Sequence, residues 1–271
     1  MDASAPPAPE PTPPGGVVAD APVDKSNARV KRMFGEIAPR YDLLNHLLSM
    51  NVDRYWRWRT TKLVKPIQSG APILDLCTGT GDLALAFDKA AGGTVQITAS
   101  DFCPEMLGLG RGKGDKRGVN DRIEWIEADA QDLPFESNTY QVVGAAFGLR
   151  NVADTDRGLR EMTRVCQPGG RVAVLEFTTP RWQPFKAFYG WYFRNVLPRI
   201  GQALMRNNTA AYEYLPESVG QFYEYEQLTE RMEAAGLDDV RYYPMTLGVA
   251  TLYVGKKVTG GARTKAEANG G

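Results

Sequence analysis

The chain has 271 residues, with 32 lysines and arginines, 32 aspartates and glutamates, and a single histidine. A net charge of zero argues against a protein whose whole surface grips nucleic acid. One histidine argues against a zinc site built from several histidines and against a Ser-His-Asp triad, and the three widely spaced cysteines are typical of reduced, buried thiols.

The two ends of the chain differ in composition from the middle. Residues 1–24 are rich in proline and alanine and lack the basic and apolar regions of a secretory signal, so we expect a disordered arm. Residues 259–271 indicate a disordered tail. Residues 25–258 are expected to form a single domain, beginning with a helical segment at 25–68. No run approaches the ~20 apolar residues of a membrane span, so we expect a cytoplasmic protein.

Strand-like and helix-like segments alternate through the middle of the chain, which predicts an α/β fold with a parallel sheet. The expected strands cover 72–77, 94–101, 122–127, 141–147 and 171–177. The expected helices cover 82–91, a segment opening at Pro104, and a segment capped by Asp154 and ended by Pro168-Gly169-Gly170. A helix is expected near 226–235, and two further strand candidates lie at 240–243 and 249–254.

A glycine loop follows the first expected strand in the segment 75–82 (DLCTGTGD). Gly79, Gly81 and Ala84 satisfy G-x-G-x-x-A, and Asp101 lies about twenty residues further on, which is also the dinucleotide fingerprint. Carboxylates beside such a loop repel a pyrophosphate. They suit a sulfonium cofactor that carries positive charge and an amino-acid tail.

Acidic residues at the ends of the next two strands favour an adenosine ligand. Asp101 can accept both ribose hydroxyls, and Asp129-Ala130 is placed for the adenine edge. The alternative is that these acids only cap helices and turns. A nicotinamide-dependent oxidoreductase is a further alternative, but its Tyr-x-x-x-Lys pattern occurs only at Tyr253 and Lys257, in an expected strand.

Several longer motifs resemble one family. The segment 75–82 resembles motif I of class I S-adenosylmethionine-dependent methyltransferases. Closer matches to the UbiE/MenG quinone C-methyltransferases lie at 34–45 (FGEIAPRYDLLN), 146–152 (AFGLRNV), 161–170 (EMTRVCQPGG), 175–177 (LEF) and 212–218 (YEYLPES). The resemblance runs from about residue 30 to residue 257. It implies a class I, Rossmann-like methyltransferase fold, with a mostly parallel, seven-stranded sheet and helices on both faces.

The resemblance implies methyl transfer from S-adenosylmethionine to a ring carbon of demethylmenaquinol, the last step of menaquinone biosynthesis. Asn51 and Asp53 stand where other members often carry glycine and histidine, and favour the menaquinone branch. A ubiquinone-precursor quinol or another phenolic molecule stays open as the substrate. The expected cofactor-binding residues are Asp75, Gly79, Thr80, Gly81, Asp101, Phe102, Asp129, Ala130 and Ala146, the last where some members carry serine.

The chemistry points to three catalytic candidates, Arg150, Asn151 and Tyr41. Methylation of carbon needs an electron-rich quinol, so a cation near the ring oxygen should help. Arg150 can stabilise a phenolate or polarise a water, and Asn151 can orient that water or the hydroxyl. The alternative for Arg150 is a buried ion pair with Glu176 or Asp129. We expect no metal.

The N-terminal segment is expected to form a lid over the cofactor, with Tyr41 facing the site. The alternative for Asp42 is a helix cap, and His46 is expected to be a packing or surface residue rather than a base.

Residues 181–206 combine five basic and many aromatic side chains with no acid. This composition favours a peripheral helix on anionic lipid at the inner face of the cell membrane, where a polyprenyl quinol resides. The alternatives are a substrate-side insertion over the pocket, spanning 181–220, and a homodimer interface. Nucleic acid is not an expected partner.

Overall fold

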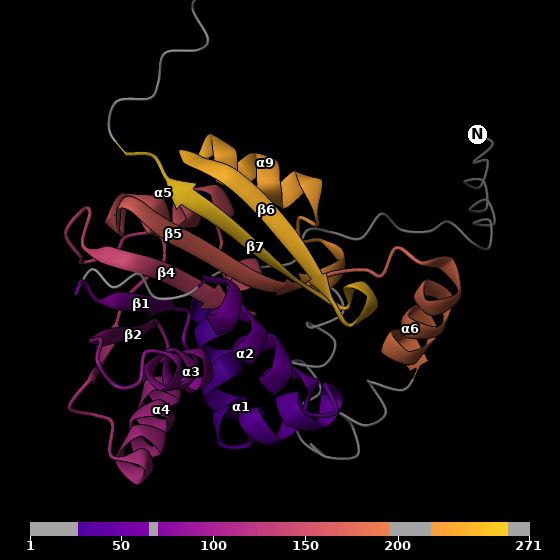
Figure 1. Ribbon diagram of the computed structural model, residues 1–271. Coiled ribbons are helices and arrows are strands. Elements are labelled where there is room, and N and C mark those ends of the chain that lie inside the picture. The colour runs from indigo at the N-terminus through magenta and orange to yellow at the C-terminus, as the bar shows by residue number, and fades with distance from the viewer. Residues whose placement is uncertain (1–26, 65–69, 196–217, 260–271) are drawn as a thin grey trace, which may run out of the picture.

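The computed structural model describes residues 27–64, 70–195 and 218–259. The predicted arm at 1–24, nearly all of the predicted tail, the segment 196–217 of the predicted insertion and most of the motif at 212–218 lie outside the described residues. The described residues form one α/β unit around a single sheet, shown in Figure 1.

Seven strands form this sheet, in the order β3-β2-β1-β4-β5-β7-β6. All neighbours are parallel except that β7 runs antiparallel to both β5 and β6. The strands are β1 (Ile73–Leu76), β2 (Ile97–Asp101), β3 (Ile123–Glu127), β4 (Tyr140–Ala146), β5 (Cys166–Phe177), β6 (Leu237–Met245) and β7 (Ala250–Lys257). The predicted mostly parallel, seven-stranded sheet is confirmed.

Helices cover both faces of the sheet. They are α1 (Asn27–Leu48), α2 (Val52–Val64), α3 (Asp82–Ala90), α4 (Pro104–Arg117), α5 (Thr155–Val165), α6 (Gln183–Asn195) and α9 (Glu226–Ala234), with short 3-10 turns η1 (Leu149–Asn151) and η2 (Thr246–Gly248). In Figure 1, α5 and α9 lie on one side of the sheet and α2 and α3 on the other. The helical part of the predicted segment 25–68 is therefore two helices, α1 and α2.

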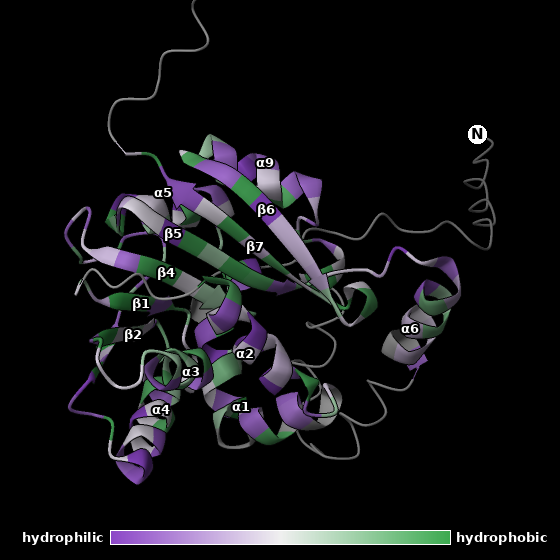
Figure 2. Cartoon of the chain, viewed as in Figure 1, coloured by the Kyte–Doolittle hydropathy of each residue, from purple (hydrophilic) through white to green (hydrophobic). Residues whose placement is uncertain are grey.

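Two separate hydrophobic cores follow from this layering. Successive residues of a strand point to opposite faces, so Ala173 and Leu175 enter the core beneath α2 and α3, whereas Val172 and Val174 enter the core beneath α5 and α9. Both faces of β5 are thus buried at 172–175, which explains why this part of the strand is a continuous apolar run. Figure 2 shows hydrophobic colour along the central strands and hydrophilic colour on the outer turns of the helices.

The end of α5 differs from the prediction. Asp154 caps the helix as expected, with its carboxylate accepting a bond from the Arg157 amide at 2.9 Å, but the helix stops at Val165 and β5 begins at once with Cys166. The predicted turn at 168–170 is a bulged part of the strand instead. A Cβ on Gly170 would lie 2.9 Å from the Gln141 carbonyl oxygen, so only glycine permits this close approach of backbones.

The chain order creates a crevice at the middle of the sheet. β1 pairs with β2 on one side and with β4 on the other. The chain therefore leads from β1 toward one edge of the sheet through β2 and β3, and toward the other edge through β4 and β5. In open α/β sheets, ligands bind outside the carboxyl ends of the strands at such a switch point. The glycine loop follows β1, and this is therefore where the site is expected.

Candidate active site

A cavity lies at this switch point, beneath α1 and above the carboxyl ends of the first four strands. It brings together residues that the sequence places far apart. Seven of the predicted site residues line it: Tyr41, Gly79, Asp101, Phe102, Asp129, Ala130 and Asn151. Five others do not line it: Asp75, Thr80, Gly81, Ala146 and Arg150.

Asp101 ends β2 with its carboxylate at the cavity. One carboxylate oxygen accepts a bond from the Gly79 amide at 2.8 Å, and the other accepts one from the Cys103 amide at 2.9 Å. Burial raises the pKa of Asp101 to about 6, and these amide donors oppose that rise. A carboxylate in this position can still accept bonds from the hydroxyls of a bound ribose.

Asp75 shapes the glycine loop from beneath. Its Oδ2 accepts bonds from the Thr78 hydroxyl at 2.5 Å and from the Ala84 amide at 2.8 Å, which joins β1 to the first turn of α3. Burial raises its pKa to about 7. These bonds assign Asp75 to the support of the loop rather than to the cavity wall.

The two glycines of the loop are required for different physical reasons. Gly79 has φ +55° and lies beneath the Tyr41 ring, whose Cε1 would be 3.8 Å from an added Cβ. Gly81 has φ +81°, and a Cβ there would lie 2.3 Å from the Trp125 ring. Gly79 therefore borders the cavity, whereas Gly81 lets the loop close against the body of the protein.

Thr80 joins the loop to α1 instead of facing the cavity. Its hydroxyl donates to Asp42 at 2.5 Å, and Lys113 of α4 bonds the Thr80 hydroxyl at 2.9 Å and the Asp42 carboxylate at 2.6 Å. We call this group the Asp42–Thr80–Lys113 cluster. Asp42 lies within the continuous helix α1, so the alternative that it caps a following helix is wrong.

Aromatic side chains of α1 cover the cavity. Phe34 and Tyr41 both line it, with their rings edge to face at a centroid distance of 6.0 Å. Burial raises the pKa of Tyr41, and the nearby positive charge of Arg150 opposes that rise. The Tyr41 hydroxyl is therefore neutral at physiological pH.

Arg150 lies in η1, immediately after β4, and is buried. Its guanidinium forms an ion pair with Glu176 at 2.9 Å, bonds the Phe147 carbonyl oxygen, and lies over the Phe177 ring at 5.4 Å. The alternative of a buried ion pair with Glu176 is thus present in the structure. The Nε of Arg150 has no hydrogen-bond partner among the described residues.

Asn151 is the polar side chain that enters the cavity from the same turn. Its Oδ1 is buried and has no hydrogen-bond partner in the described part of the chain. Buried amide oxygens are seldom left unpaired, so this atom is poised to accept a bond from a bound molecule. Ala146, the last residue of β4 and five positions before Asn151, packs against the core beneath α2 and α3.

Several lining residues were not among the predicted ones. They are Phe34, Cys77, Met106, Ala128, Gln131, Phe147, Gly148 and Val152. Four of them stand inside the quoted motifs, which is the signal that could have found them: Phe34, Phe147, Gly148 and Val152. Position directly after a strand is the signal that could have found Cys77 and Ala128. Met106 comes from α4, and no sequence pattern placed it here.

The cavity fits S-adenosylmethionine in its donor set. Asp101 offers a carboxylate that suits ribose hydroxyls, the close backbone approach at Gly79 leaves room beside the loop, and Asp129 with Ala130 lines the wall after β3. Apolar walls from Phe102 and Met106 suit a flat ring. Asn151, whose Oδ1 is buried and has no partner among the described residues, also lines this cavity.

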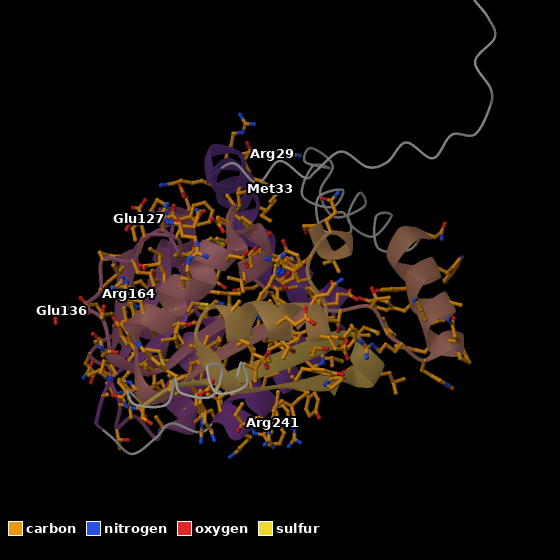
Figure 3. The ribbon with its side chains drawn as sticks, turned by 90° about the horizontal axis from the view of Figure 1, so that it is seen from above. Arg29, Met33, Glu127, Glu136, Arg164 and Arg241 are labelled. Atoms are coloured by element: carbon orange, nitrogen blue, oxygen red, sulfur yellow. The ribbon has the colours of Figure 1, made fainter. Side chains whose placement is uncertain are left out.

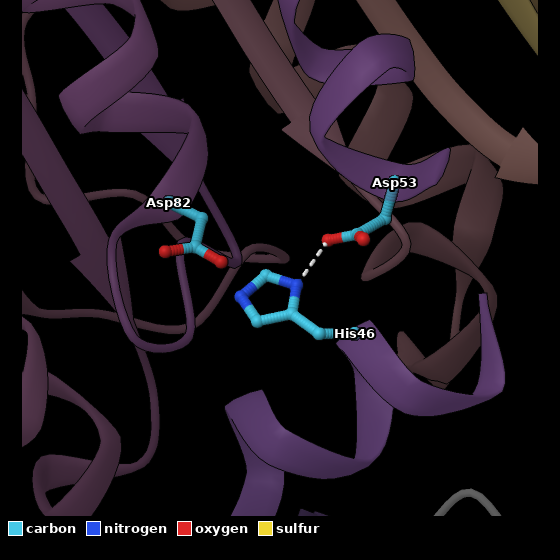
Figure 4. Close-up of side chains that lie close together, drawn as sticks. All are labelled: His46, Asp53 and Asp82. Atoms are coloured by element: carbon cyan, nitrogen blue, oxygen red, sulfur yellow. Dashed lines mark hydrogen bonds and ion pairs between the residues drawn. The ribbon is translucent and has the colours of Figure 1, made fainter. Parts of the chain in front are cut away.

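Figure 4 shows a second polar group outside the cavity, formed by His46, Asp53 and Asp82. His46 Nδ1 lies 2.9 Å from Asp53, and the possible ligand atoms lie within 4.8 Å of one another. Arg57 pairs with Asp53, and Lys113 pairs with Asp82 at 2.7 Å. These cations already neutralise both carboxylates, and His46 serves to pack α1 against α2.

The oxidoreductase alternative finds no support in the geometry of its motif. Tyr253 is fully buried in β7, and its hydroxyl accepts a bond from the Tyr225 amide at 2.6 Å. It does not line the cavity. Its role is to hold β7 to the segment that precedes α9.

Comparison with known proteins gives the family. The sequence profile described as the ubiE/COQ5 methyltransferase family matches residues 23–257. The demethylmenaquinone methyltransferase of Deinococcus radiodurans is 47% identical over 234 residues, covering 86% of this chain and 94% of that protein. The ubiquinone/menaquinone biosynthesis C-methyltransferase UbiE of Geotalea daltonii is 43% identical over 229 residues, covering 84% and 96%.

Solved structures agree on the fold. A methyltransferase from Haloferax volcanii, solved with its Trm112 activator, gives a TM-score of 0.60 at 18% identity, covering 83% of this chain and 98% of that chain. Phosphoethanolamine N-methyltransferase 2 from Haemonchus contortus, solved with S-adenosyl-L-methionine, gives 0.56 at 16% identity, covering 75% and 52%. The predicted fold and enzyme class are confirmed, and the chain belongs to the ubiE/COQ5 methyltransferase family.

Proposed function

We propose that this protein transfers the methyl group of S-adenosylmethionine to a ring carbon of demethylmenaquinol, giving menaquinol. The observation that carries this proposal is 47% identity to a demethylmenaquinone methyltransferase, over 86% of this chain and 94% of that protein. The cavity supports it, because a carboxylate suited to ribose and an unpaired amide oxygen lie in one space. When bound, S-adenosylmethionine supplies an electrophilic methyl group.

Arg150, Tyr41 and Asn151 provide the proposed catalytic environment. Arg150 lies behind the cavity wall, where Glu176 fixes its guanidinium, and from there its positive charge lowers the free energy of a developing phenolate. Asn151 Oδ1 accepts a bond from the quinol hydroxyl or from a water that takes the ring proton. Tyr41 and Phe34 exclude bulk water from above, so α1 acts as a lid.

One variant of Asn151 and one of Tyr41 test these roles. Asn151→Ala should lower kcat by about 10²-fold, the effect of removing one preorganised polar group, while S-adenosylhomocysteine affinity changes little. Tyr41→Phe tests the hydroxyl of Tyr41 in the same two assays. Unchanged activity and unchanged cofactor affinity would exclude a polar role for Tyr41.

A second candidate substrate is a ubiquinone-precursor quinol. The relatives named UbiE, at 43% identity, are named for both the ubiquinone and the menaquinone routes. Asp53 favours the menaquinone branch by the resemblance described above, although it lies buried beside Arg57 and away from the cavity. Competition between the two quinols in one reaction, read as the ratio of their kcat/KM values, decides between them.

The redox state of the substrate gives the simplest test of the reaction. A quinol ring carbon is electron-rich and a quinone carbon is not, so methyl transfer should occur with the dithionite-reduced substrate and not with the oxidised one. Equal transfer to both forms, or transfer to neither, would contradict the proposal.

We also propose that α6 contacts the inner face of the cell membrane. Among the described residues, no helix has the length and apolar character needed to cross a bilayer. Trp182 is 61% exposed, and Phe188 and Trp191 of α6 are also exposed. Figure 3, seen from above, shows α6 at the edge of the molecule with side chains projecting around it.

Replacing Trp182, Phe188 and Trp191 by serine tests this contact. The proposal predicts loss of flotation with anionic vesicles while the variant stays the same size in solution. A wild-type dimer that becomes a monomer in the variant would instead assign α6 to a homodimer interface.

A further inference from the structure

The outer face of α2 has an unusual composition. Its exposed side chains recur at helical spacing, and each is cationic or aromatic: Arg54, Tyr55, Trp58, Arg59 and Lys62. The opposite face of the helix is buried and includes Trp56, whose indole donates to Thr246 at 2.8 Å. The outward position of Tyr55 and Trp58 is therefore fixed by the anchored inner face.

The exposed aromatic residues of α2 form a contact surface rather than two isolated rings. Tyr55 is 48% exposed and Trp58 is 51% exposed, and their ring centroids lie 6.0 Å apart. Met50, in the turn before α2, is 75% exposed. Large apolar side chains gathered in this way on a single helix and its preceding turn mark an interaction site.

The charge of this face is uncompensated. Arg54, Arg59 and Lys62 form no ion pair with any acid in the described ranges, and the acid of the helix, Asp53, is buried against Arg57. On the opposite face of the sheet, α9 exposes Glu226, Glu230 and Glu233. The basic character of α2 is thus local, in a chain whose net charge is zero.

We infer that α2 is a second docking surface for an anionic phospholipid bilayer, in addition to α6, an inference that rests on the membrane contact proposed above. Cations attract the lipid phosphates, and Tyr and Trp settle at the level of the headgroups. Phe185 and Tyr189 of α6 pack against the same core cluster as Trp56 of α2, so both helices belong to one side of the sheet. Contact through both α2 and α6 provides the two membrane attachments that stable peripheral binding needs.

The exposed arginines of α5 provide a matched control. Arg157 and Arg160 are exposed on a helix of the opposite sheet face, and α5 contains no aromatic residue. The double variants Arg54→Gln/Arg59→Gln and Arg157→Gln/Arg160→Gln therefore remove the same charge from two sides of one molecule. Neither pair lines the cavity.

Flotation of the full chain with vesicles of phosphatidylcholine and 30% phosphatidylglycerol tests the inference. Removing the two α2 arginines should weaken partitioning roughly 30-fold, since each cation near an anionic surface contributes about fivefold. The α5 pair should change it by less than twofold. Trp58→Ser should weaken binding in high salt as well, because burial of its ring is not screened.

Three results would overturn the inference. Equal losses for the two arginine pairs would indicate attraction by overall charge alone. No binding of the wild-type chain to anionic vesicles, or a preference for single-stranded nucleic acid that the α2 variants abolish, would also contradict it. Methyl transfer to a water-soluble, short-chain quinol should be unchanged in the α2 variants, which separates failure of this inference from failure of the proposed reaction.

Discussion

At the residue scale, the site depends on acids that are held in a buried environment. Asp101 is 7% exposed, and its carboxylate has two amide donors but no basic partner that outweighs the cost of burial. This raises its pKa to about 6. The sequence predicted Asp101 for the site, and Asp101 does line the cavity, because the carboxyl end of the second strand meets the crevice in such a fold. It could not separate Asp101 from Asp75, whose partners come from tertiary packing.

The raised pKa of Asp101 makes cofactor affinity depend on pH. The carboxylate accepts ribose hydroxyls only when ionised, so binding is strong above about pH 6 and is lost as the pH falls below it. Titration calorimetry with S-adenosylhomocysteine should show about tenfold weaker binding at pH 5 than at pH 7. Asp101→Asn should bind weakly at both values. Equal wild-type affinity at pH 5 and pH 7 would contradict this assignment.

Gly81 is expected to be necessary for folding rather than for binding. Alanine at φ +81° is strained, and its Cβ would lie 2.3 Å from Trp125, so Gly81→Ala should cost about 3 kcal/mol or more in urea unfolding. Gly108 in α4 has open space around an added Cβ, and Gly108→Ala should stabilise the protein by about 0.5–1 kcal/mol. Similar changes at both positions would show that Trp125 moves aside.

At the element scale, α1 is attached to the glycine loop by a compact polar group. The Asp42–Thr80–Lys113 cluster connects α1, the loop before α3, and α4. The sequence predicted a helical segment here and assigned Tyr41 to the site, because the motif at 34–45 carried both. Thr80 was assigned to the cofactor, and Asp42 to a helix cap as an alternative, because spacing does not reveal a contact between residues 38 positions apart.

Weakening this cluster should loosen the lid without altering the cavity. Asp42→Asn removes a partly buried charge pair worth about 1 kcal/mol, so release of S-adenosylhomocysteine in stopped-flow displacement should be about fivefold faster. Lys31→Gln is the control, since its ion pair with Glu127 also attaches α1 but is exposed to solvent. The same release rate in wild type and Asp42→Asn would show that α1 does not gate the site.

The strand boundaries show what sequence reasoning can and cannot supply. The sequence predicted a strand at each of the seven positions, from apolar runs for the strands that are buried on both faces, such as β1 and β4, and from alternation for β3. The start of β5 at Cys166 was missed, because proline and two glycines ordinarily end an element. Here the neighbouring backbone of β4 approaches Gly170 so closely that the glycine belongs to the pairing itself.

At the scale of the whole molecule, the zero net charge is an average over unlike surfaces. Acids shape the glycine loop and the cavity, whereas α2 exposes only cations and aromatic rings. The composition alone excluded a protein that is basic throughout, but it could not reveal a basic face on one helix. That face became visible only when the buried side of α2 was known. The single histidine packs α1 against α2, and the proposed chemistry needs no histidine base.

The most direct test of the account locates the transferred methyl group. The purified protein is incubated with S-adenosylmethionine labelled with ¹³C in its methyl group and with reduced demethylmenaquinone, and the product is analysed by NMR and mass spectrometry. The label is expected on a methyl group bound to the ring carbon, at the chemical shift of an aryl methyl group. A label on oxygen, as a methyl ether, or the absence of any transfer would contradict it.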